Sequence, residues 1–197
     1  MEGRRDGEKR FWQCVGESWR GSRVFGRSGG CPVGVTVITG ERGCGKTTLL
    51  REYVDAASRA GRTVGGIASP VVYENGQRLG YDLLDLRRGV RRALARVVRG
   101  PEAVSTIGPF RFEETALVEG NAAIVAAVDD GLGVVAIDEV GPLEWGGRGW
   151  ADALTHALQE GQAGQELIVV VRTSLCERLP DRFPSPLWQT ARRLTPS

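Results

Sequence analysis

The feature that most constrains the fold is a glycine-rich stretch, GERGCGKTT, at residues 40–48. The five residues before it, VTVIT at 35–39, are all β-branched and are typical of a buried strand. After it, apolar residues at 49, 50, 53, 54 and 57 share one helical face and predict an amphipathic helix that begins at Gly45. A strand, a glycine-rich loop and a helix in direct succession predict an α/β domain with a mainly parallel sheet.

The same stretch has the spacing G-x-x-x-x-G-K-[ST] of a phosphate-binding loop. Glycines let successive backbone N–H groups turn toward an anion, and the helix N-terminus adds its positive dipole end. Lys46 is informative because Lys9 is the only other lysine among 26 basic residues. A lysine ends in a compact point charge, whereas arginine carries a wide planar fork. The residues expected to hold the nucleotide are Gly40, Glu41, Arg42, Gly43, Cys44, Gly45, Lys46, Thr47 and Thr48.

A second motif, VVAIDEVGPLEW at 134–145, runs from a continuous apolar strand into Asp138 and Glu139. Because parallel strands end at one edge of a sheet, Asp138 should face the loop and bind Mg²⁺ through water, together with the Thr47 hydroxyl. Glu139 is then placed to orient or deprotonate an attacking water. Arg172 follows the apolar run 167–171, where it could stabilise charge on the γ-phosphate, and a structural ion pair is an equal alternative.

The remaining elements fit the same α/β pattern. Asn75-Gly76 between two apolar runs predicts an antiparallel hairpin after the first helix, and Arg88-Gly89 predicts a second turn into 90–97. We expect strands at 106–112 and 188–194, helices at 113–130 and 150–158, and a short helix around 175–179. Residues 1–32 lack any periodicity and predict a mobile arm, which leaves 33–197 as the domain.

Composition excludes several classes of protein. A net charge of +2 gives no argument for nucleic acid, and no apolar run approaches the ~20 residues of a membrane span. Four cysteines without a CxxC pair favour reduced thiols in the cytoplasm over a metal site. Six arginines between Arg87 and Arg99 form either an anion-binding patch or a solvated ribbon, with no aromatic residue interleaved for base stacking.

With both motifs in place, the chain resembles the small P-loop enzymes called cancer-related nucleoside-triphosphatases. The resemblance covers about residues 34–195 and rests on GERGCGKTTLL, GIASPVVYENGQRLGYDLLDL, ALARV and IDEVGPLEW. It implies a RecA-like or nucleotide-kinase-like core that hydrolyses several nucleoside triphosphates with Mg²⁺. It also implies that Lys46 and Thr47 bind phosphate and metal, Asp138 binds metal and Glu139 is the catalytic carboxylate. Pro142 and Thr106 depart from the family pattern, which usually has basic residues there.

Hydrolysis of ATP, GTP and related triphosphates is therefore the function that the sequence predicts, with any protein partner left open. A nucleoside or nucleotide kinase on the same core is the alternative. A nucleotide-gated switch with negligible turnover is a third. Glu139 favours hydrolysis, because an attacking water has to be activated.

Overall fold

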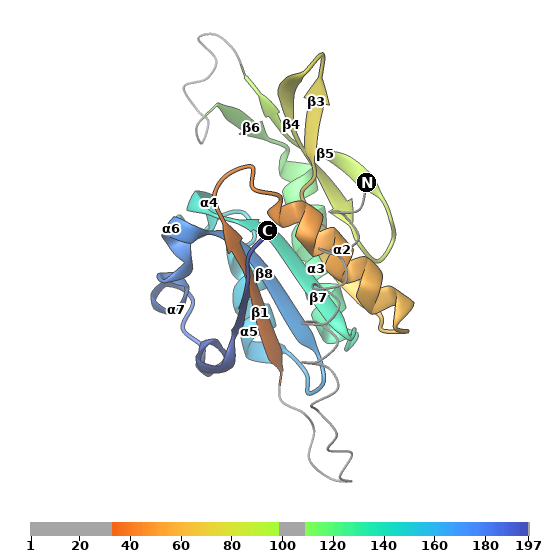
Figure 1. Ribbon diagram of the computed structural model, residues 1–197, viewed down its shortest axis with the longest axis vertical. Helices are drawn as coiled ribbons and strands as arrows, with labels where there is room; N and C mark the ends of the chain where they lie inside the picture. The colour runs from red at the N-terminus through yellow and green to blue at the C-terminus, as the bar shows by residue number, and fades with distance from the viewer. Residues whose placement is uncertain (1–32, 99–108, 197) are drawn as a thin grey trace, which may run out of the picture. The chain divides into compact units, whose positions relative to one another are not determined.

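The computed structural model describes residues 33–98 and 109–196, which form one nine-stranded sheet covered by helices (Figure 1). Eight strands follow one another across the sheet in the order β6-β5-β4-β2-β7-β8-β1-β9, and β3 pairs with β4 alongside this path. The predicted arm lies outside the described residues, so the division into an arm and a domain stays a prediction. None of the described helices is long and apolar enough to cross a bilayer.

Five strands form the parallel part of the sheet, and their carboxyl ends therefore share one edge. Every pairing between neighbours in the order β2-β7-β8-β1-β9 is parallel, which confirms the mainly parallel sheet. Their bounds are β1 Gly34–Gly40, β2 Val64–Ala68, β7 Val134–Val140, β8 Glu166–Arg172 and β9 Arg192–Leu194.

The other four strands pair antiparallel and extend the sheet from β2. They are β3 Val71–Glu74, β4 Gln77–Asp85, β5 Arg91–Val97 and β6 Phe110–Phe112. Asn75 and Gly76 join β3 to β4 with φ of 49° and 73°, as the tight turn of a hairpin requires. The predicted hairpin and the turn at Gly89, where φ is 69°, are thus confirmed.

Helices bury both faces of the sheet, which explains why its central strands are continuously apolar. On one face α2 (Lys46–Arg59) packs against β1, β2 and β7, and on the other α3 (Glu114–Asp129) packs against β2, β7 and α5 (Ala151–Glu160). Alternate residues of one strand serve the two sides: Val135 and Ile137 join the core under α3 and α5, and Ala136 faces α2. Short helices α4 (Pro142–Trp145), α6 (Thr173–Cys176) and α7 (Leu179–Arg182) complete the fold.

A buried polar cluster ties the amino ends of these strands together, far along the sheet from the glycine-rich loop. The Glu166 carboxylate accepts hydrogen bonds from Thr36 (2.9 Å), Tyr53 (2.7 Å), Arg62 (2.6 Å) and Arg192 (2.7 Å). Burial alone would raise the pKa of Glu166, but the hydrogen bonds from Arg62, Tyr53 and Thr36 lower it below its ordinary value. The cluster therefore joins β1, α2, β8 and β9 through an ionised carboxylate.

Two expectations about local structure were correct only in part. The strand expected at 188–194 is a 3₁₀ helix over Pro186–Thr190 followed by β9, because Ser185 caps Leu187 and starts a helical turn. The short helix expected around 175–179 is two helices, α6 and α7, separated near Arg178. β2, which the sequence pattern did not reveal, lies in the middle of the sheet between β4 and β7.

Candidate active site

The glycine-rich loop connects β1 to α2 at the carboxyl edge of the parallel strands. β1 ends at Gly40, which pairs with Arg172 at the end of β8, and α2 begins at Lys46. Gly43 and Gly45 adopt left-handed φ values of 80° and 95°, which residues with a Cβ rarely adopt. The glycines therefore permit the turn that brings the N-terminus of α2 to the loop.

Lys46 is buried inside this loop, with only 8% of its surface exposed. Its ammonium group donates hydrogen bonds to the carbonyl oxygens of Gly40 (3.0 Å) and Glu41 (2.8 Å). An ammonium group has three donors, so these two carbonyls leave one for an anion. The loop thus holds a positive charge at a defined point beside the helix N-terminus.

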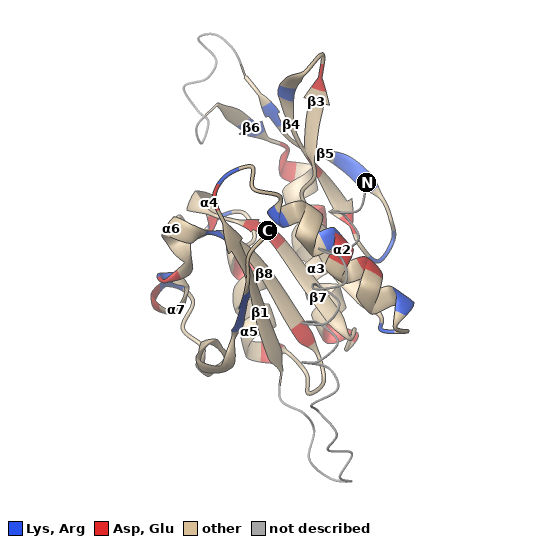
Figure 2. Ribbon diagram, in the orientation of Figure 1, with Lys and Arg blue, Asp and Glu red and all other residues tan. Residues whose placement is uncertain are grey.

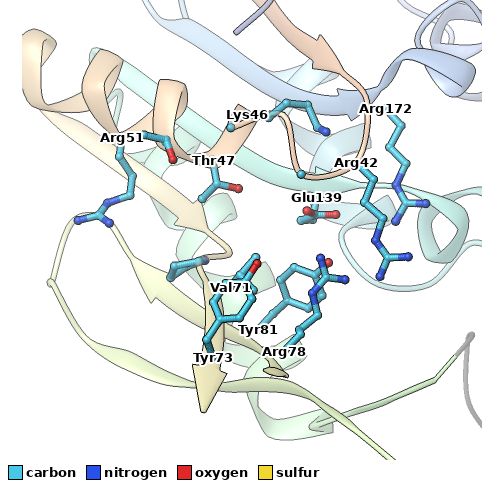
Figure 3. Close-up of a pocket in the computed structure, with 14 residues that line it drawn as sticks. Arg42, Lys46, Thr47, Arg51, Val71, Tyr73, Arg78, Tyr81, Glu139 and Arg172 are labelled. Atoms are coloured by element: carbon cyan, nitrogen blue, oxygen red, sulfur yellow. The ribbon is translucent and has the colours of Figure 1, made fainter. Parts of the chain in front are cut away.

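A cavity of about 340 Å³ opens between the loop and the β3–β4 hairpin (Figure 3). Six of the nine predicted loop residues line it: Arg42, Gly43, Gly45, Lys46, Thr47 and Thr48. Gly40, Glu41 and Cys44 do not line it. Cys44 instead places its sulfur against Gly40, where an added Cβ would lie 2.5 Å from Sγ.

Asp138 lies behind the cavity wall and is completely buried. Its two oxygens accept the backbone N–H groups of Ser69 and Glu139, each at 2.8 Å. Burial, reinforced by the charge of Glu139, raises the pKa of Asp138 to about 7, while hydrogen bonds from Ser69, Thr47 and Glu139 oppose this shift. The Thr47 hydroxyl is therefore a direct neighbour of Asp138.

This pair of residues fits Mg²⁺. A hydroxyl and a carboxylate are hard oxygen donors, and Mg²⁺ in phosphate sites is commonly held by one or two protein groups, waters and substrate phosphates. A positive ion would also offset the buried charge of Asp138. Within residues 33–98 and 109–196, no cluster of three or more His, Cys, Asp or Glu residues could hold a metal ion unaided. The Thr47 hydroxyl and the Asp138 carboxylate therefore suit an ion that binds together with the substrate phosphates.

Glu139 faces the cavity because β7 is irregular at this residue. Its φ is 60°, a left-handed value that is uncommon for a residue with a side chain, and the pairing of β7 with β8 shifts register between Ile137 and Val140. Such a bulge reorients one side chain relative to the strand. Glu139 lines the cavity opposite the hairpin, as Figure 3 shows.

Two arginines lie on the same side of the cavity as Glu139. Arg42 comes from the loop and Arg172 from the end of β8, and both line the cavity (Figure 3). No ion-pair partner is recorded for either within the described residues, so the alternative of a structural ion pair for Arg172 gains no support. Their charges can instead compensate an anion.

The turn after Glu139 is held by another buried carboxylate. Glu144 in α4 accepts the backbone N–H groups of Gly141 (2.7 Å) and Trp150 (2.9 Å). Burial raises the pKa of Glu144 to about 7, although these hydrogen bonds lower it in part. This contact fixes the exit of β7, and with it the start of the segment that follows Glu139.

The hairpin side of the cavity was not predicted from sequence. Tyr73, Arg78 and Tyr81 reach toward the loop (Figure 3), and the Arg78 guanidinium lies 5.3 Å from the centre of the Tyr81 ring. Burial, with the Glu139 carboxylate as the next cause, raises the pKa of Tyr81 above its ordinary value. The hairpin signal was clear in the sequence, but only the antiparallel pairing of β4 with β2 shows which way it faces.

The arginine cluster of 87–99 is engaged by carboxylates. Figure 2 shows acidic residues beside the basic ones around the β4–β5 turn. The pairs are Arg87–Asp130, Arg88–Asp85, Arg91–Asp82, Arg92–Glu119 and Arg96–Asp82. Arg99 lies outside the described residues. These pairings support a solvated ribbon and give no site for an anion.

These features define a P-loop NTPase-like α/β fold with a mixed sheet and an inserted hairpin. Residues 35–186 match the family described as NTPase, and the chain belongs to that family. This confirms the resemblance found in the motifs.

Individual relatives agree with this assignment. "Nucleoside-triphosphatase THEP1" of Methanopyrus kandleri is 36% identical over 121 residues, 61% of this chain and 65% of that protein, which is slightly less than two thirds. The protein of the same name from Archaeoglobus fulgidus is 33% identical over 146 residues, 74% of this chain and 81% of the relative. The solution structure of a human cancer-related nucleoside triphosphatase superposes with a TM-score of 0.63, at 22% identity over 83% of this chain and 88% of that chain. At this identity the human structure supports the fold alone.

Proposed function

We propose that the protein hydrolyses nucleoside 5′-triphosphates, ATP and GTP among them, to the diphosphate and phosphate with Mg²⁺ as cofactor. The observation that carries the proposal is the meeting of Lys46, Thr47, Glu139 and Arg172 around one cavity, with Asp138 directly behind it. The chain belongs to the NTPase family and its relatives are named nucleoside-triphosphatases, which supports the same activity. The cysteine pattern supports a reducing, cytoplasmic setting.

In this mechanism the loop binds the phosphates through its N–H groups and the free donor of Lys46. Thr47 and Asp138 would hold Mg²⁺, which when bound neutralises phosphate charge and orients the β- and γ-phosphates. Glu139 takes a proton from a water molecule as its oxygen attacks the γ-phosphorus. Arg42 and Arg172 stabilise the negative charge on the γ-phosphate as it is transferred to water.

The test is a turnover panel with ATP, GTP, CTP and UTP, each with Mg²⁺ and with excess EDTA. We expect free phosphate and nucleoside diphosphate in equal amounts with Mg²⁺, and neither product with EDTA. A preparation of Lys46→Ala, purified in parallel, controls for contaminating phosphatases. Diphosphate that forms only when an acceptor is added would favour a kinase, and tight binding without turnover would favour the switch.

A further inference from the structure

A second cavity, of about 280 Å³, adjoins the first, and Arg42 is the one residue of the glycine-rich loop that lines it. The two cavities share four lining residues: Arg42, Tyr81, Glu139 and Arg172. Three of these are the charged groups placed above at the γ-phosphate. A molecule in the second cavity would therefore meet the reacting end of a triphosphate across the Glu139 carboxylate.

The body of this second cavity is apolar, unlike the first. Its wall is formed by side chains from β5, β6, α3, α4 and the start of α5: Leu94, Phe110, Phe112, Leu117, Leu143 and Trp150. Aliphatic and aromatic walls of this kind favour an apolar ligand, because moving apolar surface from water into such a cavity is favourable. The size of the cavity suits a body of about one ring. An attacking water molecule would not require an apolar cavity of this kind.

One polar side chain on the wall has an unused hydrogen-bonding group. Ser69 is completely buried, and its hydroxyl is one of three buried side-chain atoms that have no hydrogen-bond partner within the described ranges. Of these three, only the Ser69 hydroxyl belongs to a residue that lines the second cavity. A buried hydroxyl without a partner costs free energy, which a ligand with a polar group would recover.

The backbones of Ser69 and Glu139 both contact the Asp138 carboxylate. The backbone N–H of Ser69 donates to one oxygen of Asp138, and that of Glu139 donates to the other. Both residues also line the second cavity, so a ligand there lies against the wall that Glu139 shares with Ser69. The cavity thus combines an apolar body with two polar residues on its wall, Ser69 and Glu139.

We propose that this second cavity binds an alcohol with an apolar, ring-sized body, and that the alcohol accepts the γ-phosphoryl group in place of water. The proposal rests on the triphosphate site of the proposed function. The alcohol oxygen attacks the γ-phosphorus and forms a new P–O bond, while the bond from the γ-phosphorus to the β,γ-bridging oxygen breaks. The hydroxyl proton passes to Glu139, and the products are a phosphomonoester and the nucleoside diphosphate.

The first experiment measures binding to the full chain. The probes are benzyl alcohol and 2-phenylethanol, each paired with its hydrocarbon, toluene or ethylbenzene, and followed by ligand-observed NMR in the presence of Mg²⁺ and the β,γ-imido analogue of ATP. We expect both alcohols to bind. Ser69→Ala should weaken the alcohols about fivefold, the loss of one hydrogen bond, and should leave the hydrocarbons unchanged.

Two variants of α3 locate the binding. Leu117→Trp places a bulky ring in the cavity and should weaken every probe tenfold or more, because an overfilled cavity excludes a ligand. Val118→Trp adds the same ring to an exposed neighbour on the same helix, 69% exposed, and should leave binding unchanged. Circular dichroism and thermal unfolding of both variants establish that they fold.

The second experiment follows transfer by ³¹P NMR with Mg²⁺–ATP and either alcohol. A new phosphomonoester signal, lost in Leu117→Trp and kept in Val118→Trp, is the expected result. Binding of neither alcohol, binding that Leu117→Trp does not change, or binding without a phosphomonoester would each overturn the proposal. Phosphate release without alcohol tests hydrolysis separately, so failure of one proposal is distinguishable from failure of the other.

Discussion

At the scale of single residues, Lys46 is the clearest test of the loop. Its ammonium group fits between two backbone carbonyl oxygens, at 3.0 and 2.8 Å. The planar guanidinium group of an arginine is too wide to make both contacts from the same position. We expect Lys46→Ala to lower phosphate release about 10²–10³-fold, the usual loss for one preorganised donor, and Lys46→Arg to lower it nearly as much.

The control for Lys46→Arg is the same change at the other lysine, Lys9→Arg, in the predicted arm. It should keep wild-type turnover. Wild-type turnover in Lys46→Arg itself would contradict the steric argument for a lysine at this position.

Glu139 separates binding from chemistry. Glu139→Gln keeps the size of the side chain but removes the base, so turnover should fall about 10²-fold or more while the affinity for Mg²⁺ and the imido analogue of ATP stays within a few-fold. Single-turnover kinetics and equilibrium titration measure the two quantities. An equal loss of both would instead make Glu139 a metal-binding or structural residue.

The backbone at Glu139 allows a second, independent measurement. At a φ of 60°, glycine avoids the steric cost that a side chain meets. We expect Glu139→Gly to be at least as stable as the wild type in urea unfolding, although turnover is lost. A clear loss of stability would show that the glutamate side chain supports the fold.

At the scale of elements, the link between β7 and α5 depends on the protonation of Glu144. Its pKa is raised to about 7 from an ordinary value of 4.5. The folded protein therefore holds this proton more tightly than the unfolded chain does. The resulting contribution to the free energy of unfolding, about 3 kcal/mol at most, is complete below about pH 4.5 and is lost as the pH rises through about 7.

Glu144→Gln should accordingly reduce the fall in stability between pH 5 and pH 8. Urea unfolding of both proteins in EDTA across this range checks it. Asp138 contributes in the same direction, because burial raises its pKa as well, so the difference between the two proteins isolates Glu144. Identical pH slopes would mean that Glu144 is ionised throughout.

The long helices and the hairpin have clear local signals and were predicted correctly, and β2 shows why other elements were not. The sequence there is VGGIA, and its two glycines interrupt any strand pattern. The structure explains both: a Cβ on Gly65 would lie 2.6 Å from Ala127 in α3, and one on Gly66 would lie 2.1 Å from the carbonyl oxygen of Ala136. Close packing on both sides selects glycine here, and only the tertiary structure shows it.

The site divides in the same way. Lys46, Thr47 and Asp138 follow from loop spacing and from the end of an apolar strand, both of which are local patterns. The bulge at Glu139 depends on the pairing of β7 with β8, and the direction of Arg78 and Tyr81 depends on the pairing of β4 with β2. The sequence therefore indicated the residue type at 139 but not its backbone conformation.

At the scale of the whole molecule, the strands of residues 34–194 find all their recorded partners among themselves. We therefore expect a chain that begins at Pro32 to fold and to keep full turnover, because the strand neighbours and the lining of the first cavity are retained. Thermal unfolding and phosphate release, compared with the full chain, measure this. A chain that does not unfold cooperatively, or that has lost activity, would show that residues 1–31 are part of the domain.

The ends of the sheet also bear on how the protein behaves at high concentration. In the described part of the chain, the path of strands ends at β6 on one side and at β9 on the other, and each is only three residues long. Each also carries arginine: Arg111 in β6, and Arg192 and Arg193 in β9. Long, flat, apolar edges recruit strands from other molecules, whereas short edges with charged side chains resist it. Both ends of the strand path are thus short, charged strands that discourage amyloid-like stacking.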